Sequence, residues 1–364
     1  IDQGSDHYLD TGGQIAVSGD GPHAVAIWGE GYEATFGIAI DSTPPEITIA
    51  TPPFGAVYEL GTAAAASFAC VDAGSGIAAC TGTTANGNPL PTDQIGTHSL
   101  QIDAADNVGH TSTASRSYEI VGPVTFVVGP NPAEIGQEVT ATAAFTATSH
   151  PVTAVIDWGD GTICDTGVDP ECVVDSATVE ATHVYDATGV HAIAITLFHG
   201  DSLVQTADEV FLAVFDPTAG SVSGYGRIVA PTGSFAGAPD ADPVIKFGVS
   251  ARYKKGATVP TGNVRIDVRD QLFDGWDFDT TALTSLIVAG GTALVKGTAT
   301  AASGIEVWFA VVVRDIDPSG HGDAVRIKIW DAAGMLLDTG LGLPDWDPAG
   351  VTTLSQGQIM VRPN

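Results

Sequence analysis

Hydrophobic and polar residues alternate with a period of two along several short stretches of this chain. Ile156 and Trp158 share one phase of the first clear stretch, and Asp160-Gly161 follows it directly. Ile193, Ile195 and Leu197 repeat the pattern further along. Because successive side chains of a strand point to opposite faces, these stretches predict half-buried β-strands. The Asp-Gly pair predicts a hairpin turn after the first of them.

The last third of the chain carries the same pattern. Val264, Ile266 and Val268 alternate with charged residues, and an uninterrupted apolar run over 308–313 is typical of a buried strand. Few long helical patterns occur, and 44 glycines and 21 prolines indicate many turns. The sequence therefore predicts an all-β protein of tandem β-sandwiches, with Trp158, Trp308 and Trp330 in their cores.

Two linked motifs occur in this part of the chain, Trp158-Gly159-Asp160-Gly161-Thr162, and Thr182-His183-Val184-Tyr185 with Gly189-Val190-His191. Together they resemble the motifs of a PKD domain, an Ig-like β-sandwich of secreted and surface proteins. The resemblance covers 122–216. It implies an extracellular sandwich domain over that range.

Other segments resemble further modules of bacterial secreted and surface proteins. Residues 42–121 resemble a bacterial Ig-like repeat, through Asp41-Ser42-Thr43-Pro44-Pro45, Asp72 to Cys80, and Asp106-Asn107-Val108-Gly109. Residues 217–364 resemble a terminal, jelly-roll-like β-sandwich that often closes such proteins, through Gly224 to Ile228, Asp315 to Asp323, and Gly357-Gln358-Ile359.

Residues 1–41 read as a partial Ig-like domain that holds late strands only. A Gly-x-His strand start recurs at His23, His98 and His191, and too few residues precede its first copy to supply the opening strands. Ile1 is not an initiator residue, so we expect a processed product or a fragment. The missing strands were either removed with upstream domains or are supplied by another chain through strand addition.

Charge is distributed unevenly along the chain. The net charge is -30 with a pI near 4.2, and residues 1–226 hold 28 acidic groups against one basic group, Arg116. Such acidity excludes nucleic-acid binding, which needs clustered cations. It favours solubility; the alternatives are a divalent-cation requirement, or docking onto the less acidic terminal domain of a neighbour. No stretch is long and apolar enough to predict a membrane span.

The cysteines form two close pairs, Cys70 with Cys80 and Cys164 with Cys172. Neither pair has zinc-site spacing, so two short-loop disulfides are predicted, with free buried thiols as the alternative. Cys70 and Cys80 are expected on adjacent strands that flank a Gly-rich turn, unlike the inter-sheet bridge of antibody domains. Disulfides place the protein outside the cytoplasm, in the extracellular space or on the cell surface.

Two groups of residues in the last domain are candidate sites. Asp315, Asp317 and Asp323 enclose two glycines and could supply oxygen ligands to calcium; the alternative is that they cap their own turns. Trp276 and Trp346 lie in acidic, loop-like settings, where they could stack on sugar rings; the alternative is that they pack against the sandwich.

No catalytic set is predicted, so we expect no enzyme. Gly200-Asp201-Ser202-Leu203 spells a lipase signature, but it falls in an all-β hairpin rather than a strand-to-helix turn. The sequence predicts a structural or adhesive extracellular protein that self-associates or binds other surface proteins, in a filament or surface layer. The alternative is an accessory region of a larger secreted hydrolase that binds polysaccharide or protein.

Overall fold

The computed structural model is all-β. It describes residues 41–217, 219–254, 257, 259–269, 276–301 and 304–363, and within 1–40 the backbone of four strands alone. The one described helical element is a single 3-10 turn, η2 (Pro348–Gly350). No helix in these ranges has the length and apolar composition that crossing a bilayer requires.

The chain divides by its contacts into two compact units. The first holds 1–123 with the loops 146–151 and 199–203, and the second holds the rest of the chain from 124 onward. The predicted domain boundaries at 41, 121 and 216 stay a prediction.

The N-terminal strands form an antiparallel sheet in the order β1-β2-β3-β4. Their bounds are β1 (His7–Tyr8), β2 (Gln14–Val17), β3 (His23–Gly29) and β4 (Tyr32–Ile38). The predicted completion of this region by a strand from another chain lies outside the described residues.

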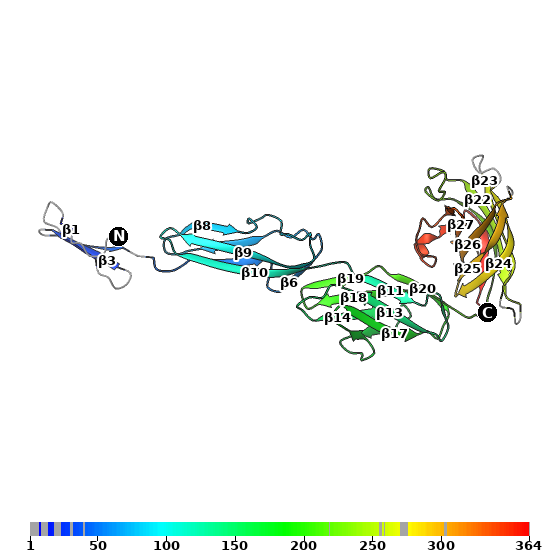
Figure 1. The fold of residues 1–364 in the computed structure, drawn as a ribbon, viewed down its shortest axis with the longest axis horizontal. Helices are drawn as coiled ribbons and strands as arrows, with labels where there is room; N and C mark the ends of the chain where they lie inside the picture. Colours follow the sequence, from blue (N-terminus) through cyan, green and yellow to red (C-terminus); the bar gives the residue numbers. More distant parts are fainter. Residues whose placement is uncertain are drawn as a thin grey trace. The chain divides into compact units, whose positions relative to one another are not determined.

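Residues 46–121 form a sandwich of two sheets, β5-β7 and β6-β10-β9-β8 (Figure 1). The strands are β5 (Glu46–Thr51), β6 (Ala56–Glu59), β7 (Ser67–Val71), β8 (Ile77–Gly82), β9 (Gly96–Asp106) and β10 (Thr111–Val121). Alternate residues of β9 and β10, among them Leu100, Ile102 and Ile120, fill the core between the sheets. We refer to this part as the first sandwich.

Residues 125–215 form a second sandwich, with sheets β11-β13-β17-β16 and β12-β20-β18-β14-β15, in which β19 also pairs with β18. The strands are β11 (Thr125–Gly129), β12 (Ala133–Glu134), β13 (Glu138–Ala144), β14 (Val152–Asp157), β15 (Ile163–Asp165), β16 (Val173–Val174), β17 (Thr178–Val184), β18 (Gly189–His199), β19 (Leu203–Thr206) and β20 (Val210–Phe215). Ile193, Ile195 and Leu197 of β18 are buried, as their alternation predicts.

The predicted Asp-Gly hairpin joins β14 to β15, where Ile156 pairs with Cys164. Asp160 Oδ1 accepts the Thr162 N–H at 2.9 Å and so closes the turn. Gly159 has φ 73° and leaves no room for a side chain, because a Cβ there would lie 2.5 Å from the Ala192 carbonyl oxygen. Backbone conformation and this close approach both require glycine at 159.

The histidines of the second sandwich belong to an aromatic cluster beside this turn. The Trp158 ring stacks on His183 at 5.0 Å, and His183 meets Tyr185 at 4.5 Å. His183 Nε2 lies 2.7 Å from Asp160 Oδ2, and the Tyr185 hydroxyl donates to the Trp158 carbonyl at 2.7 Å. His191 lies against Tyr185 at 4.4 Å. These contacts give the histidines a structural role, tying β17 and β18 to the turn.

Both predicted disulfides are formed, and each links the two sheets of its sandwich. Cys70 lies on β7 and Cys80 on β8, which belong to opposite sheets. The sequence placed them on adjacent strands beside a turn, unlike an inter-sheet bridge; the structure corrects this, because the segment after Cys70 carries the chain from one sheet to the other. Cys164 on β15 reaches Cys172, just before β16 of the facing sheet.

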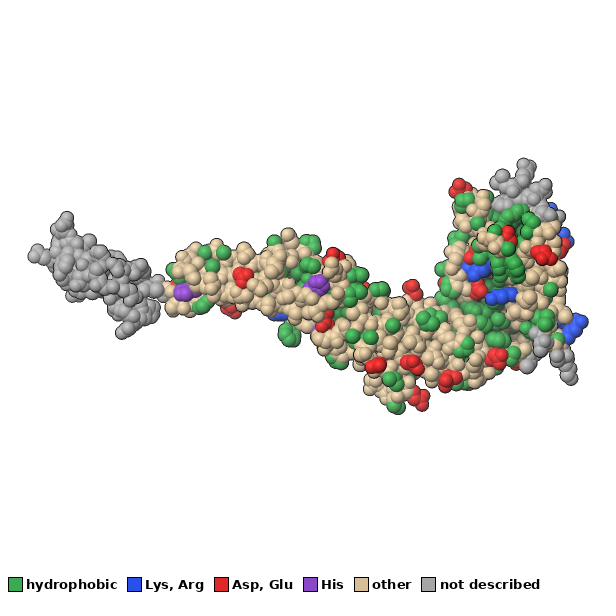
Figure 2. All heavy atoms as spheres, viewed as in Figure 1, with side chains coloured by type: hydrophobic (Ala, Val, Ile, Leu, Met, Phe, Trp, Pro, Cys, Tyr) green, Lys and Arg blue, Asp and Glu red, His purple; other side chains and the backbone are tan. Residues whose placement is uncertain are grey.

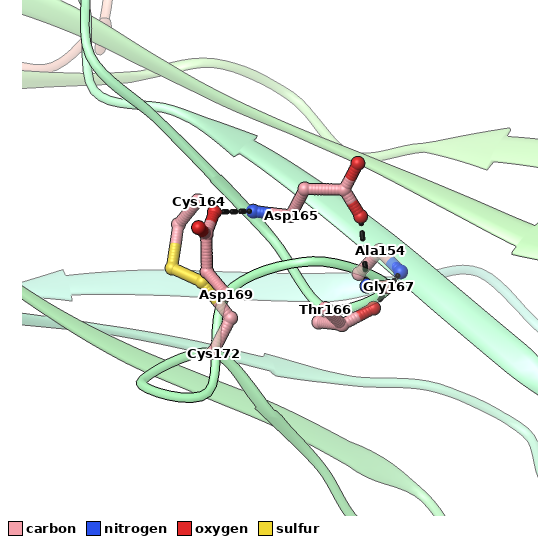
Figure 3. The surroundings of a disulfide bond; sticks show 7 residues. All are labelled: Ala154, Cys164, Asp165, Thr166, Gly167, Asp169 and Cys172. Carbon is pink, nitrogen blue, oxygen red and sulfur yellow. Dashed lines mark hydrogen bonds between the residues drawn. A yellow bond between two sulfur atoms is a disulfide. The ribbon is translucent and has the colours of Figure 1, made fainter.

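The short loop closed by the second disulfide is held by its own polar groups (Figure 3). Asp169 Oδ2 accepts the Asp165 N–H at 2.8 Å, and Asp165 Oδ1 accepts the Gly167 N–H at 2.8 Å. Thr166 Oγ1 accepts the Ala154 N–H at 2.8 Å, which fixes the loop to β14.

Residues 221–362 form one antiparallel sheet in the order β28-β27-β26-β25-β24-β23-β22-β21-β30, with β29 against β27. The strands are β21 (Ser221–Val229), β22 (Val244–Arg252), β23 (Thr261–Arg269), β24 (Asp277–Ala289), β25 (Thr292–Ala301), β26 (Glu306–Arg314), β27 (Ala324–Asp331), β28 (Gly334–Asp338), β29 (Thr352–Thr353) and β30 (Gln356–Arg362). The sheet curls around one core, which includes Phe247, Phe309 and Ile327. This order differs from that of a jelly roll, because β21 to β28 pair in chain order and β30 pairs with β21.

A separate apolar cluster joins the second sandwich to the terminal domain within the second unit. Ala213 of β20 packs with Ala289, Leu294, Val312 and Trp346, all of which are buried. This contact covers part of the outer face of the terminal sheet, the face that points away from its own core.

Candidate contact face of the C-terminal domain

The four tryptophans of the last domain differ in exposure. Trp346 is 7% exposed and packs in the joint with the second sandwich, so its packing alternative describes it. Trp276 is partly buried, 5.5 Å from Phe235, and packs against the terminal core. Trp308, predicted in the core, is 44% exposed, so that prediction is wrong.

Trp308 belongs to a strip that crosses four strands on the outer face. Thr298 on β25 pairs with Trp308, Trp308 with Trp330 on β27, and Trp330 with Met335 on β28. Residues paired in this way lie side by side on one face, so with strands about 4.8 Å apart the strip extends roughly 14 Å. Met335 is 45% exposed, whereas Trp330 is partly buried against the joint. We call Thr298, Trp308, Trp330 and Met335 the tryptophan strip.

Two lysines run beside the strip in the next row of the same face. Lys328 Nζ lies 2.5 Å from Asp345 Oδ1, and Lys296 Nζ lies 3.9 Å from the other oxygen of that carboxylate. Figure 2 shows hydrophobic and Lys or Arg side chains lying together on the terminal domain. An exposed apolar strip rimmed by polar groups is typical of an interaction site.

A buried ion pair fixes the loop that carries Asp345 and Trp346. The Arg326 guanidinium donates to both Asp338 oxygens at 3.0 Å and to the Pro344 carbonyl at 2.6 Å. Burial opposes ionisation of Asp338, but hydrogen bonds from Arg326 and two backbone N–H groups outweigh it and lower the pKa of Asp338 below its usual value. The loop is thereby held against β27, next to the strip.

The sequence contains a signal for the exposure of Trp308 that the apolar run conceals. Glu306 and Trp308 share one phase of β26, whereas Val307 and Phe309 share the core phase. Ala310 and Val312 continue the outer phase, but the second sandwich covers them. The run is therefore apolar on both faces: one face packs in the core of the terminal sheet, and part of the other face packs against the second sandwich.

The predicted calcium residues lie near one another in the fold but are engaged by the protein itself. Asp323 is buried and accepts the Ile316 and Ile359 N–H groups at 3.0 and 2.8 Å. Asp315 accepts the Val361 N–H at 3.0 Å, and Asp317 accepts hydrogen bonds from Ser319. Among the described residues these carboxylates do not form a cluster with metal-ligand spacing. Asp317 caps its own turn, as the alternative expects, whereas Asp315 and Asp323 accept N–H groups of β30 and so fix this loop to that strand.

A different group of possible ligands occurs in the first sandwich. Ligand atoms of Asp41, Asp106 and His110 lie within 4.8 Å of one another. Asp106 Oδ1 already accepts three backbone N–H groups, and its Oδ2 lies 2.7 Å from His110 Nδ1. Burial opposes ionisation of Asp106, yet these bonds lower its pKa. The cluster therefore closes the turn after β9.

The serine of the lipase-like sequence lies in the turn between β18 and β19. Ser202 Oγ donates to the Gly55 carbonyl at 2.7 Å, so its hydroxyl is used in a structural hydrogen bond. A nucleophile needs a base within hydrogen-bond reach, whereas among the described residues Ser202 Oγ donates to a backbone carbonyl.

Comparisons with known proteins find a broad likeness to tandem sandwich proteins. No family model matches the chain, and no curated protein matches it. Among solved structures, titin domains I67–I69 are similar over 81% of this chain and 96% of theirs, at 8% identity and a TM-score of 0.29. Fibronectin(III)-like modules of Clostridium thermocellum CbhA are similar over 46% of this chain and 95% of theirs, at 15% identity and a TM-score of 0.24. The insect immune protein hemolin has 11% identity and a TM-score of 0.22, over 53% of this chain and 55% of its own. With scores this low, the assignment of fold rests on the strands described above.

Proposed function

We propose that this chain is a non-catalytic extracellular protein of structural or adhesive type, built from an Ig-like, a PKD-like and a terminal β domain of bacterial type. The tryptophan strip carries the proposal. Trp308 and Met335 expose apolar surface on a rigid sheet, beside lysines, in a chain whose net charge of -30 is carried almost entirely by residues 1–226. Such a strip provides a contact for a partner of opposite charge.

The partner that best fits is the acidic part of a second copy, or of a similar surface protein, in a filament or surface layer. Residues 1–226 have a net charge of −27, whereas 227–364 are close to neutral at −3. Electrostatic complementarity favours association of unlike surfaces over like ones. Calcium would assist by screening the acidic region, without a requirement for a dedicated site.

Sedimentation velocity over a range of concentrations tests this function. We expect the native chain to associate and a Trp308→Glu variant to stay monomeric. Val229→Glu is the matched control, because Val229 is 49% exposed on β21, outside the strip, and its variant should associate like the native chain. A native chain that stays monomeric at high concentration, with and without calcium, would contradict self-association.

A second function, polysaccharide binding as an accessory region of a secreted hydrolase, is supported by the same strip. Flat, exposed aromatic rings bind the apolar faces of sugars. Pull-down with insoluble polysaccharides distinguishes the two: retention that Trp308→Ala abolishes, in a chain that remains monomeric, favours this second function over assembly. Trp346→Ala is not a suitable probe, because its ring is buried in the joint.

A further inference from the structure

The first compact unit contains a pocket of about 240 Å³, where β6 meets β10 of the first sandwich beside the loop 146–151. β6 pairs with β10 only from Tyr118 onward, so the pocket lies beside the last residues of β10 that β6 does not cover. Its lining includes Phe54, Arg116, Glu119, His150 and several hydroxyl groups, those of Thr97, Ser115, Ser117 and Ser149. It is smaller than the 300–1,000 Å³ of typical drug-sized sites, and suits one small ring.

Arg116 is the one Lys or Arg in 1–226, and no carboxylate of the described residues pairs with it. Its guanidinium lies 5.8 Å from the centre of the Phe54 ring, and among the described residues it makes no ion pair or hydrogen bond. An arginine amid 28 acidic residues would pair with one of them if its position allowed. The guanidinium is therefore free to bind an anion that enters from outside.

The acidic residue of the pocket is already engaged. Both Glu119 oxygens accept the Ser149 N–H, at 3.1 and 3.0 Å. His150 Nδ1 is buried without a hydrogen-bond partner, 3.9 Å from Glu119 Oε2. The His150 ring packs closely against Gly55, where a Cβ would lie 2.8 Å from Nε2. A buried ring nitrogen without a partner is an unmet hydrogen-bonding group that a ligand can satisfy.

These groups select a ligand with one carboxylate on a hydroxylated ring. The guanidinium matches a carboxylate, and His150 together with the serine and threonine hydroxyls matches sugar hydroxyls. Phe54, 89% exposed, offers a face for ring C–H groups. A dense polyanion would be repelled by the net charge of this region, whereas a single acidic sugar would not.

We propose that this pocket binds a single acidic sugar, such as a uronic acid that terminates or sparsely decorates an otherwise neutral glycan. Arg116 holds the carboxylate, and Phe54 supports the ring. The site lies in a different domain from the tryptophan strip and acts independently of it.

Calorimetric or NMR titration of the full chain tests the proposal with methyl β-D-glucuronide and methyl β-D-glucoside, which differ only in the carboxylate. We expect the glucuronide to bind at least about tenfold more tightly, as one charge-assisted hydrogen bond implies. Arg116→Gln should remove that preference, and Phe54→Ala should weaken both sugars. Arg265→Gln is the control for lost positive charge, because Arg265 is 63% exposed in the terminal domain.

Three outcomes would overturn the proposal. They are equal affinity for the two sugars, an unchanged preference in Arg116→Gln, and binding of a glutamate-containing peptide with no binding of the glucuronide. Tighter binding of polygalacturonate per uronate unit than of the single sugar would also contradict it. Because Arg116 makes no hydrogen bond in the described fold, its variant should unfold at the native temperature, which separates loss of binding from loss of structure.

Discussion

The acidic sandwiches and the terminal domain neutralise their carboxylates in different ways. In the described part of residues 41–226, every ion pair uses histidine, as in Asp106–His110 and Asp160–His183. In the terminal domain the ion pairs use Lys or Arg, including the buried Arg326–Asp338 pair. Where cations are almost absent, backbone N–H groups replace them. The comparison shows that high net charge can be accommodated by assigning carboxylates to turns.

The two regions also differ in what holds their sheets together. All four cysteines lie before residue 173, and each disulfide links facing sheets that share only a small core. The terminal domain has no cysteine and relies on one continuous sheet around a large core. Four predictions test whether the sandwiches and the terminal domain are stabilised by different interactions.

The largest effect is expected at Arg326. Arg326→Leu leaves the buried Asp338 carboxylate without its partner and should destabilise the terminal domain by about 3–5 kcal/mol. Differential scanning calorimetry should show the loss in one transition, with the sandwich transition unchanged. Arg265→Leu removes an exposed pair with Asp279 and should cost less than about 1 kcal/mol. Equal losses from the two variants would contradict a special role for the buried pair.

Reduction of the disulfides should affect only the sandwiches. The Cys164–Cys172 bridge closes a short loop, and Cys164→Ser with Cys172→Ser should destabilise the second sandwich by about 2–3 kcal/mol through the entropy of the unfolded chain. A phosphine reductant should lower the sandwich transitions and leave the terminal transition in place. A terminal transition that moved as far would show that the regions unfold together.

The sequence predicts the strands of both regions well, because alternation is a local property of each strand. Ile193, Ile195 and Leu197 follow it, and so does the Asp160-Gly161 hairpin. Cysteine spacing likewise identified both disulfides. None of these depends on a distant segment.

What the sequence did not predict depends on contacts between segments far apart in the chain. Trp308 was assigned to a core because apolar Ala310 and Val312 continue its phase, yet those two are covered by the second sandwich and Trp308 is not. Cys80 lies in the sheet opposite Cys70 because of where β8 pairs, which local spacing does not specify. In the sequence, Arg116 is notable only as the one Lys or Arg of residues 1–226. The pocket that it lines is formed by segments far apart in the chain and could not be predicted.

Acid should weaken the second sandwich through Asp160. Burial opposes ionisation of this carboxyl, but hydrogen bonds from Thr162 and His183 prevail and hold its pKa at about 2. Because the folded-state pKa is depressed, this carboxylate stabilises the fold at pH values above its unfolded pKa near 3.9. The contribution, about 1–2 kcal/mol after solvent screening of this exposed group, disappears as the pH falls from about 4 to 2. Urea unfolding at several pH values measures this. Asp160→Asn should remove that part of the acid sensitivity; an unchanged pH profile would contradict the assignment.

The smallest effect is expected from salt, and it tests the charge asymmetry directly. Raising the ionic strength from 0.01 to 0.15 M shortens the screening length from about 30 to 8 Å, which weakens repulsion among exposed carboxylates. The sandwiches, with a net charge of −27 over residues 1–226, should gain about 1 kcal/mol, a rise of roughly 4 °C in melting temperature. The terminal domain, at −3, should change by less than half as much, because its surface pairs lose attraction while its like charges lose repulsion. Sodium chloride and a chloride salt of a bulky monovalent cation should act alike, since screening depends on ionic strength. A larger gain confined to the terminal domain would mean that its few excess charges are clustered, and that net charge alone does not distinguish the two regions.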